Sequence, residues 1–245
     1  MYGFSLLPGI WGVFSILLGL VSVGAFVKWE TKSESPVFDI DLFRKNKVFA
    51  FSSLATMINY SAIFAVSFLL SLYLQLIKGL SPQAAGMILV SQPIVQTVFS
   101  PFAGRLSDRI DPRIVASTGM ALTAVGLALF VFLDEKTTIS FIVVSLILIG
   151  FGLALFSSPN TNAVMSSIGK KYYGVASGAL GTMRITGNMF SMGIVMLIFS
   201  LYIGRTQITP SYYPLFIKSV KSAFIIFTAL CLAGIFASLP RGRVR

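Results

Sequence analysis

The sequence contains no histidine and a single cysteine, Cys231, among its 245 residues. Without histidine, the chain lacks the commonest metal ligand and the commonest general base of enzymes. One cysteine excludes a disulfide within the chain, and its position inside an apolar run is typical of a small packing residue. The sequence also has no catalytic dyad, no metal-binding cluster and no phosphate-binding glycine loop. We therefore expect no enzyme, no metal site and no cofactor.

Charge is also scarce, because only 11% of the residues are charged, whereas soluble domains carry about 25%. Hydrophobic residues make up 56% of the chain, and its mean hydropathy is +0.87. This composition is typical of a protein that crosses the lipid bilayer several times. The net charge of +11 would suggest a nucleic acid partner for a soluble protein. Here the basic residues gather between apolar runs, so we expect no nucleic acid partner.

Apolar runs of membrane-spanning length follow one another along the chain, since a spanning helix needs roughly 20 mostly apolar residues. We expect an all-α membrane protein with seven transmembrane helices, one extra helix followed by a six-helix bundle. Residues 1–27 would form the extra helix, residues 28–48 a cytoplasmic linker with a short amphipathic turn, and residues 49–245 the bundle. Prolines predict kinks in the third and fifth spans. The expected spans are 4–27, 49–77, 81–104, 113–133, 139–168, 174–203 and 221–239.

Lysine and arginine are unevenly distributed over the two sides of the predicted helices. One side receives the linker 28–48, the loop 104–113, the pair Lys170 and Lys171, and the arginines of the C-terminal tail, whereas the other side has fewer basic residues. Because cytoplasmic loops carry the excess of lysine and arginine, we expect the basic side to face the cytoplasm. The chain would then be a multi-pass protein of the cell membrane, with its N-terminus outside and its C-terminus in the cytoplasm.

A highly charged loop lies between two long apolar runs and reads Gly104-Arg105-Leu106-Ser107-Asp108-Arg109-Ile110-Asp111-Pro112-Arg113. It resembles the loop motif of the major facilitator superfamily, written G-x-L-[AS]-D-R-x-G-x-[RK]-[RK]. Asp111 replaces the second glycine of that pattern, and Arg113 alone remains of its basic end. Such divergence is common in the C-terminal copy of the motif.

Further stretches resemble the fourteen-span drug:proton antiporter branch of that superfamily, namely 26–30, 36–44, 73–86 and 174–178. The resemblance covers essentially the whole chain. In that branch the C-terminal motif copy follows the tenth span, so the resemblance implies that the spans correspond to spans eight to fourteen. The sequence would then be a C-terminal half only, without the N-terminal half that carries the other motif copy and the antiporter motif.

The resemblance implies that the charged loop works as a conformational latch. Asp108 ends one helix, where it could pair with Arg113 and with the positive N-terminus of the next helix. A contact that forms in one access state and breaks in the other would bias their equilibrium by roughly 1–3 kcal/mol. The alternative is that these charges only cap a helix and fix the topology. The expected latch residues are Gly104, Leu106, Asp108, Arg109 and Arg113.

Polar residues inside the predicted spans are the candidates for a substrate cavity. Arg184 lies about 15 Å beyond Gly174 along its helix, near the midplane, where an arginine costs at least ~2.5–3.5 kcal/mol unless it faces water or a partner. Buried amides either bind substrate or hold helices together, and both readings remain open. Glycines 174, 178 and 181 are expected to permit close helix packing. The candidate cavity residues are Asn59, Gln92, Gln96, Asn160, Arg184 and Asn188.

Together these features predict the C-terminal half of a multidrug or metabolite efflux transporter that works by alternating access, with substrate between two bundles. Proton coupling normally requires a titrating carboxylate in the membrane, and the predicted spans contain none. Coupling to the proton gradient would therefore need a partner N-terminal half-transporter. The other expected partners are the lipid bilayer and an amphiphilic small-molecule substrate. The alternative is a non-transporting truncated remnant or an accessory membrane subunit.

Overall fold

The computed structural model describes residues 9–30, 40–204 and 208–238, and the regular structure of these ranges is helical throughout, with no strand. Six helical segments are long and apolar enough to cross a membrane. The expected all-α membrane fold is thereby confirmed. The helices are α2 (Ile10–Glu30), α3 (Ile40–Lys45), α4 (Lys47–Leu76), α5 (Pro82–Leu89), α6 (Ser91–Arg109), α7 (Pro112–Leu129), α8 (Ile139–Ser166), α9 (Tyr173–Tyr202) and α10 (Tyr213–Ser238), with short 3-10 turns at 130–132, 170–172 and 210–212.

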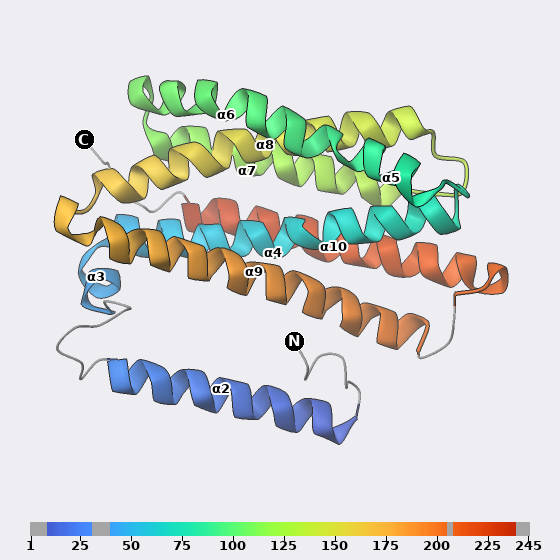
Figure 1. The fold of residues 1–245 in the computed structure, drawn as a ribbon, viewed down its shortest axis with the longest axis horizontal. Coiled ribbons are helices and arrows are strands. Elements are labelled where there is room, and N and C mark those ends of the chain that lie inside the picture. Colours follow the sequence, from blue (N-terminus) through green and yellow to red (C-terminus); the bar gives the residue numbers. More distant parts are fainter. Residues whose placement is uncertain (1–8, 31–39, 205–207, 239–245) are drawn as a thin grey trace.

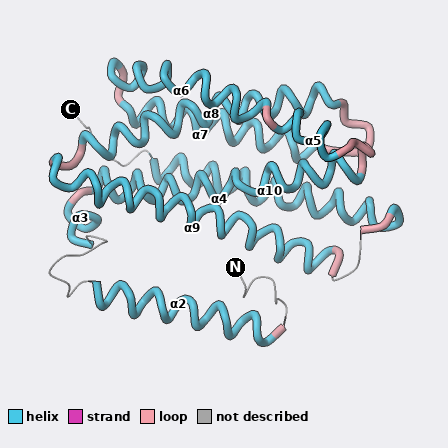
Figure 2. Tube along the Cα trace, in the orientation of Figure 1, coloured by secondary structure: helices cyan, strands magenta, loops and turns pink. Residues whose placement is uncertain are grey.

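The spanning helices form a bundle with α6, α7 and α8 in one layer and α4, α9 and α10 in the other (Figure 1). In the first layer α8 packs against both α6 and α7, and in the second α4 packs against both α9 and α10. The layers are joined where α7 meets α10 and where α8 meets α4. Figure 2 shows the loops at the two ends of the bundle. The largest fully buried side chains include Tyr73, Phe130, Phe156, Phe216, Phe224 and Phe227.

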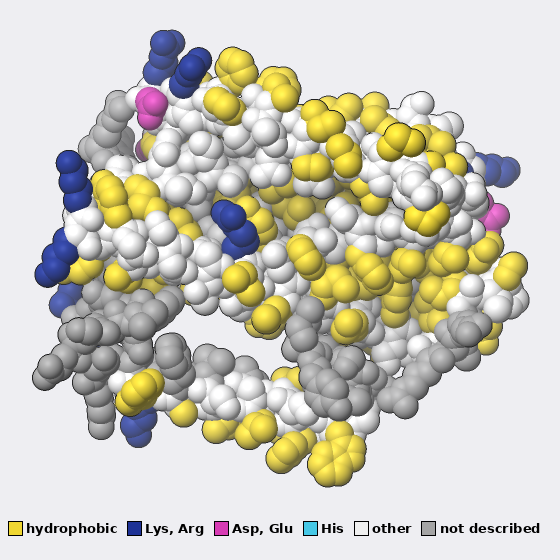
Figure 3. Space-filling view, viewed as in Figure 1, with side chains coloured by type: hydrophobic (Ala, Val, Ile, Leu, Met, Phe, Trp, Pro, Cys, Tyr) yellow, Lys and Arg dark blue, Asp and Glu magenta, His cyan; other side chains and the backbone are white. Residues whose placement is uncertain are grey.

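The first expected span is a helix, α2, that lies apart from the bundle in Figures 1 and 3. Its Trp11, Phe14 and Val21 side chains are exposed. Helix α2 has 21 residues, but it is not among the six candidate spans found in the described residues. A seventh span and the division into domains therefore stay predictions. The amphipathic turn expected in the linker is α3, which packs against the start of α4.

The third expected span is interrupted near its proline, as expected: α5 and α6 meet at Val90 and together form one candidate span, Pro82–Arg109. Pro93 has no N–H to donate to the carbonyl of Leu89, so the helical hydrogen bonding is interrupted at this turn. The pair also extends beyond the expected end, to Arg109. Pro101 and Pro159, in contrast, lie inside the continuous helices α6 and α8.

The seventh expected span also differs, because its helix α10 begins at Tyr213 and not at Lys221. Lys218 and Lys221 lie within the helix. Long basic side chains bury their carbon stems and keep their ammonium groups at the surface, so a lysine in the first turns of a helix does not mark its boundary.

Glycine sets the closest helix contacts in the bundle. A Cβ atom added at Gly119 of α7 would lie 2.6 Å from the carbonyl oxygen of Gly152 on α8. One added at Gly187 of α9 would lie 2.5 Å from the carbonyl oxygen of Met57 on α4. The glycines that the sequence singles out for close packing instead face open space in this chain, so that expectation is wrong for Gly174, Gly178 and Gly181.

Hydrogen bonds tie the helices together at both ends of the bundle. At one end, the Asn46 side chain caps α4, and its Nδ2 donates to the carbonyl oxygen of Ser167 at the end of α8, 2.7 Å away. At the other end, the Tyr73 hydroxyl of α4 donates to the carbonyl oxygen of Asp134 in the loop before α8. A 3.0 Å hydrogen bond from the Thr137 hydroxyl lowers the pKa of the Asp134 carboxyl below its usual range.

Replacing Gly119 by alanine should therefore lower the stability of the bundle by roughly 1–3 kcal/mol, because the new methyl group would collide with the backbone of α8. Thermal unfolding of the purified chain in detergent micelles measures this effect. The matched control is Gly178→Ala, whose methyl group would meet open space and whose stability should be unchanged or higher. Equal destabilisation of both variants would contradict the packing role of Gly119.

Candidate functional site

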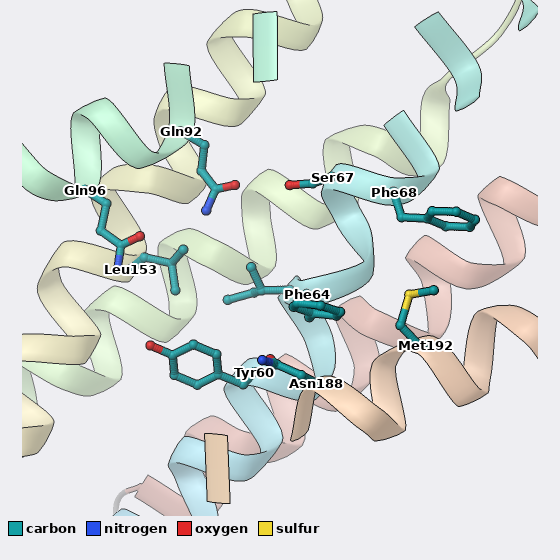
Figure 4. A pocket seen from close by; sticks show the side chains of 10 residues that line it. Tyr60, Phe64, Ser67, Phe68, Gln92, Gln96, Leu153, Asn188 and Met192 are labelled. Carbon is teal, nitrogen blue, oxygen red and sulfur yellow. The ribbon is translucent and has the colours of Figure 1, made fainter. Parts of the chain in front are cut away.

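A cavity of about 530 Å³ opens between α4, α6, α8 and α9. Figure 4 shows the polar ends of Tyr60, Ser67, Gln92 and Gln96 arranged around its space. Aromatic and aliphatic side chains complete the wall, so the cavity offers both apolar surface and hydrogen-bonding groups. The lining residues are Tyr60, Ile63, Phe64, Ser67, Phe68, Gln92, Gln96, Leu153, Asn188 and Met192.

The wall on α4 is a stripe of residues that recur every three or four positions, from Tyr60 through Phe64 to Phe68. This spacing places them on one face of a helix. The cavity candidates drawn from the sequence include none of these aromatic residues and not Ser67. The three- to four-residue spacing could have revealed them, because it begins at Tyr60 and includes Ser67, two residues with hydroxyl groups.

Gln92 and Gln96 are one helical turn apart on α6, and both line the cavity, as Figure 4 shows. The close approach of α6 to α8 positions them, because a Cβ atom added at Gly150 of α8 would lie only 2.5 Å from the Gln92 carbonyl oxygen. The expectation that this pair shares a face agrees with this placement. Whether the pair contacts substrate stays a prediction.

Arg184 projects from the middle of α9, and its guanidinium carbon lies 4.9 Å from the centre of the Tyr60 ring. A guanidinium stacked on a tyrosine face is held by a cation–π interaction. A second, narrower cavity lies beside this pair and is bordered by Thr56, Asn160 and Thr161 as well. Tyr60 lines both cavities, whereas Arg184 lines only the narrower one, whose volume is about 10 Å³. Asn188, one turn along α9, lines the larger cavity itself.

The two remaining candidates are buried between helices. Asn160 of α8 donates through Nδ2 to the Thr56 hydroxyl at 2.9 Å and to the Ser52 carbonyl oxygen at 3.3 Å, which links α8 to α4. Asn59 of α4 is fully buried and lines neither cavity, although Tyr60 lines both. Consecutive helical residues point about 100° apart, which explains why neighbours in sequence face different surroundings.

The charged loop joins α6 to α7. The Asp111 side chain caps α7 by accepting from the backbone N–H of Arg113 at 3.0 Å, and the Arg113 guanidinium lies 3.5 Å from the same carboxylate. Arg113 is therefore ion-paired with the aspartate that replaces the motif's glycine. The expected latch pairing of Arg113 with Asp108 stays a prediction.

The latch residues lie at the surface end of α6, next to α8. Gly104 permits close contact there, because an added Cβ atom would lie 3.0 Å from the Ser158 hydroxyl oxygen. The buried Ser107 hydroxyl accepts a 3.0 Å hydrogen bond from Asn162 of α8. Leu106, Asp108 and Arg109 are exposed. Asp108 borders a pocket of about 480 Å³ that is also lined by Asn162 and by Tyr173 of α9.

Three of the predicted cavity residues thus meet in the larger cavity: Gln92, Gln96 and Asn188. Arg184 and Asn160 border the narrower one. Within the described ranges, no group of three or more His, Cys, Asp or Glu side chains gathers at a possible metal site. The chemistry that this arrangement offers is binding, through amide and hydroxyl groups, aromatic faces and one guanidinium.

The family model described as Major Facilitator Superfamily matches residues 52–244. Riboflavin transporter RibZ of Clostridioides difficile is 25% identical over 210 residues, which cover 86% of this chain and 46% of RibZ. Lincomycin resistance protein LmrB of Listeria monocytogenes is 23% identical over 243 residues, which cover 94% of this chain and 50% of LmrB. The chain thus spans about half the length of these curated relatives.

A solved structure of a mutant of the nucleoside transporter NupG has a similar fold, with a TM-score of 0.61 at 19% sequence identity. The similarity covers 83% of this chain and 51% of NupG. At this level of identity the likeness concerns the arrangement of the helices, and it agrees with the family match.

Asn160→Ala should lower the stability of the bundle by roughly 0.5–2 kcal/mol, because two hydrogen bonds between α8 and α4 are lost. Thermal unfolding in detergent micelles provides the measurement. Asn188→Ala is the matched control, since the Asn188 Oδ1 atom has no hydrogen-bond partner in the described part of the chain, and its stability should change by less than about 0.5 kcal/mol. If Asn188→Ala lowered the stability more than Asn160→Ala, Asn160 would not be the amide that holds the helices together.

Proposed function

Since the chain belongs to the Major Facilitator Superfamily, we propose that it forms the C-terminal half of an efflux transporter for amphiphilic drugs or metabolites. It is a multi-pass membrane protein of a transporter family, and its relatives include proteins named for riboflavin transport and lincomycin resistance. The proposal extends this membership to alternating access, with substrate held in the cavity between α4, α6, α8 and α9 and a second bundle opposite.

The cavity is the observation that carries the proposal. Its volume of about 530 Å³ lies within the roughly 300–1,000 Å³ of small-molecule sites. Phe64, Phe68 and Met192 offer apolar surface, while Gln92 and Gln96 offer amide groups. An amphiphilic molecule needs this combination, because its apolar body gains from burial while its polar groups must be hydrogen-bonded.

A partner N-terminal half belongs to the proposal for two reasons. The chain spans about half the length of its relatives, and residues 47–76, 112–132 and 139–166 contain no Asp or Glu inside the membrane. A proton-coupled mechanism would therefore draw its titrating carboxylate from the other half, as in the fourteen-span drug:proton antiporters that the sequence resembles. The proton gradient would then supply the energy.

The distribution of charge supports the proposed orientation. In Figure 3 the basic side chains gather mainly at the end of the bundle where α6 and α8 finish and α9 begins. Arg109, Arg113, Lys170 and Lys171 lie there. Because lysine and arginine accumulate on the cytoplasmic side, this end would face the cytoplasm, together with the C-terminus, and the N-terminus would lie outside.

The proposed latch acts at this same end. Ser107 and Asn162 couple the charged loop to α8, one of the cavity helices. In one access state, the exposed Asp108 carboxylate would form an ion pair, either with the partner half or with the loop. In the other access state this ion pair would be broken. A contact of this kind shifts the equilibrium by roughly 1–3 kcal/mol.

Expression of this chain alone in an efflux-deficient bacterial host should give no drug resistance and no drug-driven proton movement, because the coupling carboxylate is missing. Co-expression with the N-terminal half of a fourteen-span relative should raise efflux of amphiphilic dyes. Resistance with proton antiport from the chain alone would refute the need for a partner half. Inactivity in both cells, with both proteins in the membrane, would favour an accessory or non-transporting role.

Asp108→Asn should slow transport roughly 5-fold or more in a full-length transporter that carries this chain as its C-terminal half, because one access state loses its latch. Dye transport into proteoliposomes measures the rate, and membrane insertion should be unchanged. Asp134→Asn, at the opposite end of the bundle, is the matched control and should transport normally. An unchanged rate for Asp108→Asn would leave the loop with a role in topology alone.

A further inference from the structure

Resting on the proposed function, we propose that Arg184 makes the cavity selective for amphiphiles that carry an anionic headgroup, a carboxylate or a phosphate. The guanidinium would bind the headgroup, and the larger cavity would hold the apolar body. This assignment gives the transported molecule a charge, which the fold and the family membership leave open.

The first argument is the charge balance of the membrane interior. Arg184 lies eleven residues beyond Tyr173, the first residue of α9, and at about 1.5 Å per residue this places it roughly 16 Å along a helix that crosses the membrane. The chain contains eight Asp and Glu residues in all. They occupy the linker, the loops and the helix ends, at positions 30, 34, 39, 41, 108, 111, 134 and 135. Among the residues that the structure describes, no Asp or Glu lies inside a span at the depth of Arg184, so its charge attracts anions and repels cations.

The second argument is that the surroundings of Arg184 are polar. The guanidinium stacks on the Tyr60 ring, with 4.9 Å between its central carbon and the ring centre. The residues around the adjoining narrow cavity include Thr56, Asn160 and Thr161. An arginine in hydrocarbon costs at least ~2.5–3.5 kcal/mol at the membrane centre, so it faces a polar space there.

The third argument is continuity with the larger cavity. Tyr60 lines both cavities, and Asn188 lies about 6 Å from Arg184 along the axis of α9. The Asn188 Oδ1 atom is buried without a hydrogen-bond partner in the described part of the chain, although Asn188 lines the cavity. A ligand bound at Arg184 would thus extend past Asn188 towards Phe64 and Met192. Carboxylate and phosphate oxygens suit the fork of N–H groups of arginine.

An acidic side chain of the partner half is the competing counter-ion. In that case the arginine would be neutralised in the assembled transporter, and the preference for the acid would be lost once the N-terminal half is added to the chain. The space that Arg184 itself lines holds only about 10 Å³, so an anionic headgroup would reach the guanidinium from the larger cavity past Tyr60, which lines both. The wall of Phe64, Phe68 and Met192 in that larger cavity suits the apolar body of a small molecule and favours the ligand.

The test measures equilibrium binding to the purified full chain in uncharged maltoside micelles at pH 7. The probes are dansyl-labelled undecanoic acid, its primary amide, and a dansyl-labelled undecyl trimethylammonium ion, which share one apolar body. The acid should bind roughly 10- to 100-fold more tightly than the amide, as expected for a charge-assisted hydrogen bond, and the cation should bind most weakly. Arg184→Gln should make the acid and the amide bind with equal affinity, because the charge that distinguishes them is removed.

Two further variants complete the design. Arg184→Lys keeps the charge and should retain a preference for the acid, whereas Arg44→Gln, on exposed α3, should bind all three probes like the unmodified chain. Circular dichroism and thermal unfolding verify that each variant is folded. The assignment would be overturned by any of four results. Three concern the unmodified chain, namely equal binding of the acid and the amide, tightest binding of the cation, or no saturable binding. The fourth is a preference for the acid that survives Arg184→Gln. If the chain binds the acid preferentially but gives no efflux when co-expressed with an N-terminal half, the result would count against the proposed function and not against the anion site.

Discussion

The hydrocarbon interior of a membrane excludes charge and unpaired backbone groups, and this constraint governs the whole molecule. Each span is helical because only internal hydrogen bonds satisfy the backbone there. Hydroxyl groups inside the spans obey the same rule: Thr56 and Thr123 donate to carbonyl oxygens of the preceding turn at 2.9 Å and 3.0 Å. The ionised residues of the loops around Asp108 and Asp134 lie at opposite ends of the bundle. The few polar groups that break the rule are therefore informative.

Close packing replaces the hydrophobic effect as the force between these helices, since lipid tails are as apolar as the side chains that meet them. Gly119 and Gly152 bring α7 onto α8, and Gly187 brings α9 onto α4. Asn160 adds hydrogen bonds between α8 and α4. The result is two tight layers with polar side chains of α4, α6 and α9 left around a cavity. The tightly packed helices thus hold the polar side chains of the cavity wall in fixed positions.

Buried polar atoms without hydrogen-bond partners in the described residues occur at Asn188, which lines the cavity, and also at Ser52, Ser53 and Asn59 of α4, which do not. Arg184 stacks on Tyr60 in the middle of a span, and the Asn188 Oδ1 atom one turn away lacks a hydrogen-bond partner among the described residues. Buried polar groups are nearly always satisfied in folded proteins, so those left over point to a missing ligand or neighbour. Asn188 lines the larger cavity and Arg184 the narrower one, whereas the charged loop with Asp108 lies at the end of α6. The proposed binding site and the proposed latch therefore lie at different levels of the same bundle.

Helix type, span positions and the charged loop are properties of local sequence, because about 20 apolar residues can cross a membrane only as a helix and charges must lie at its ends. The likeness of residues 104–113 to a transporter motif was equally visible in the sequence. Tertiary structure decided which polar residues meet, because that depends on the rotation of each helix about its axis and on its neighbours. It directed Gln92, Gln96 and Asn188 to one cavity, buried Asn59 and assigned Asn160 to helix packing. It also moved close packing from Gly174 and Gly178 to Gly119 and Gly187, because a glycine permits contact only where another backbone lies opposite.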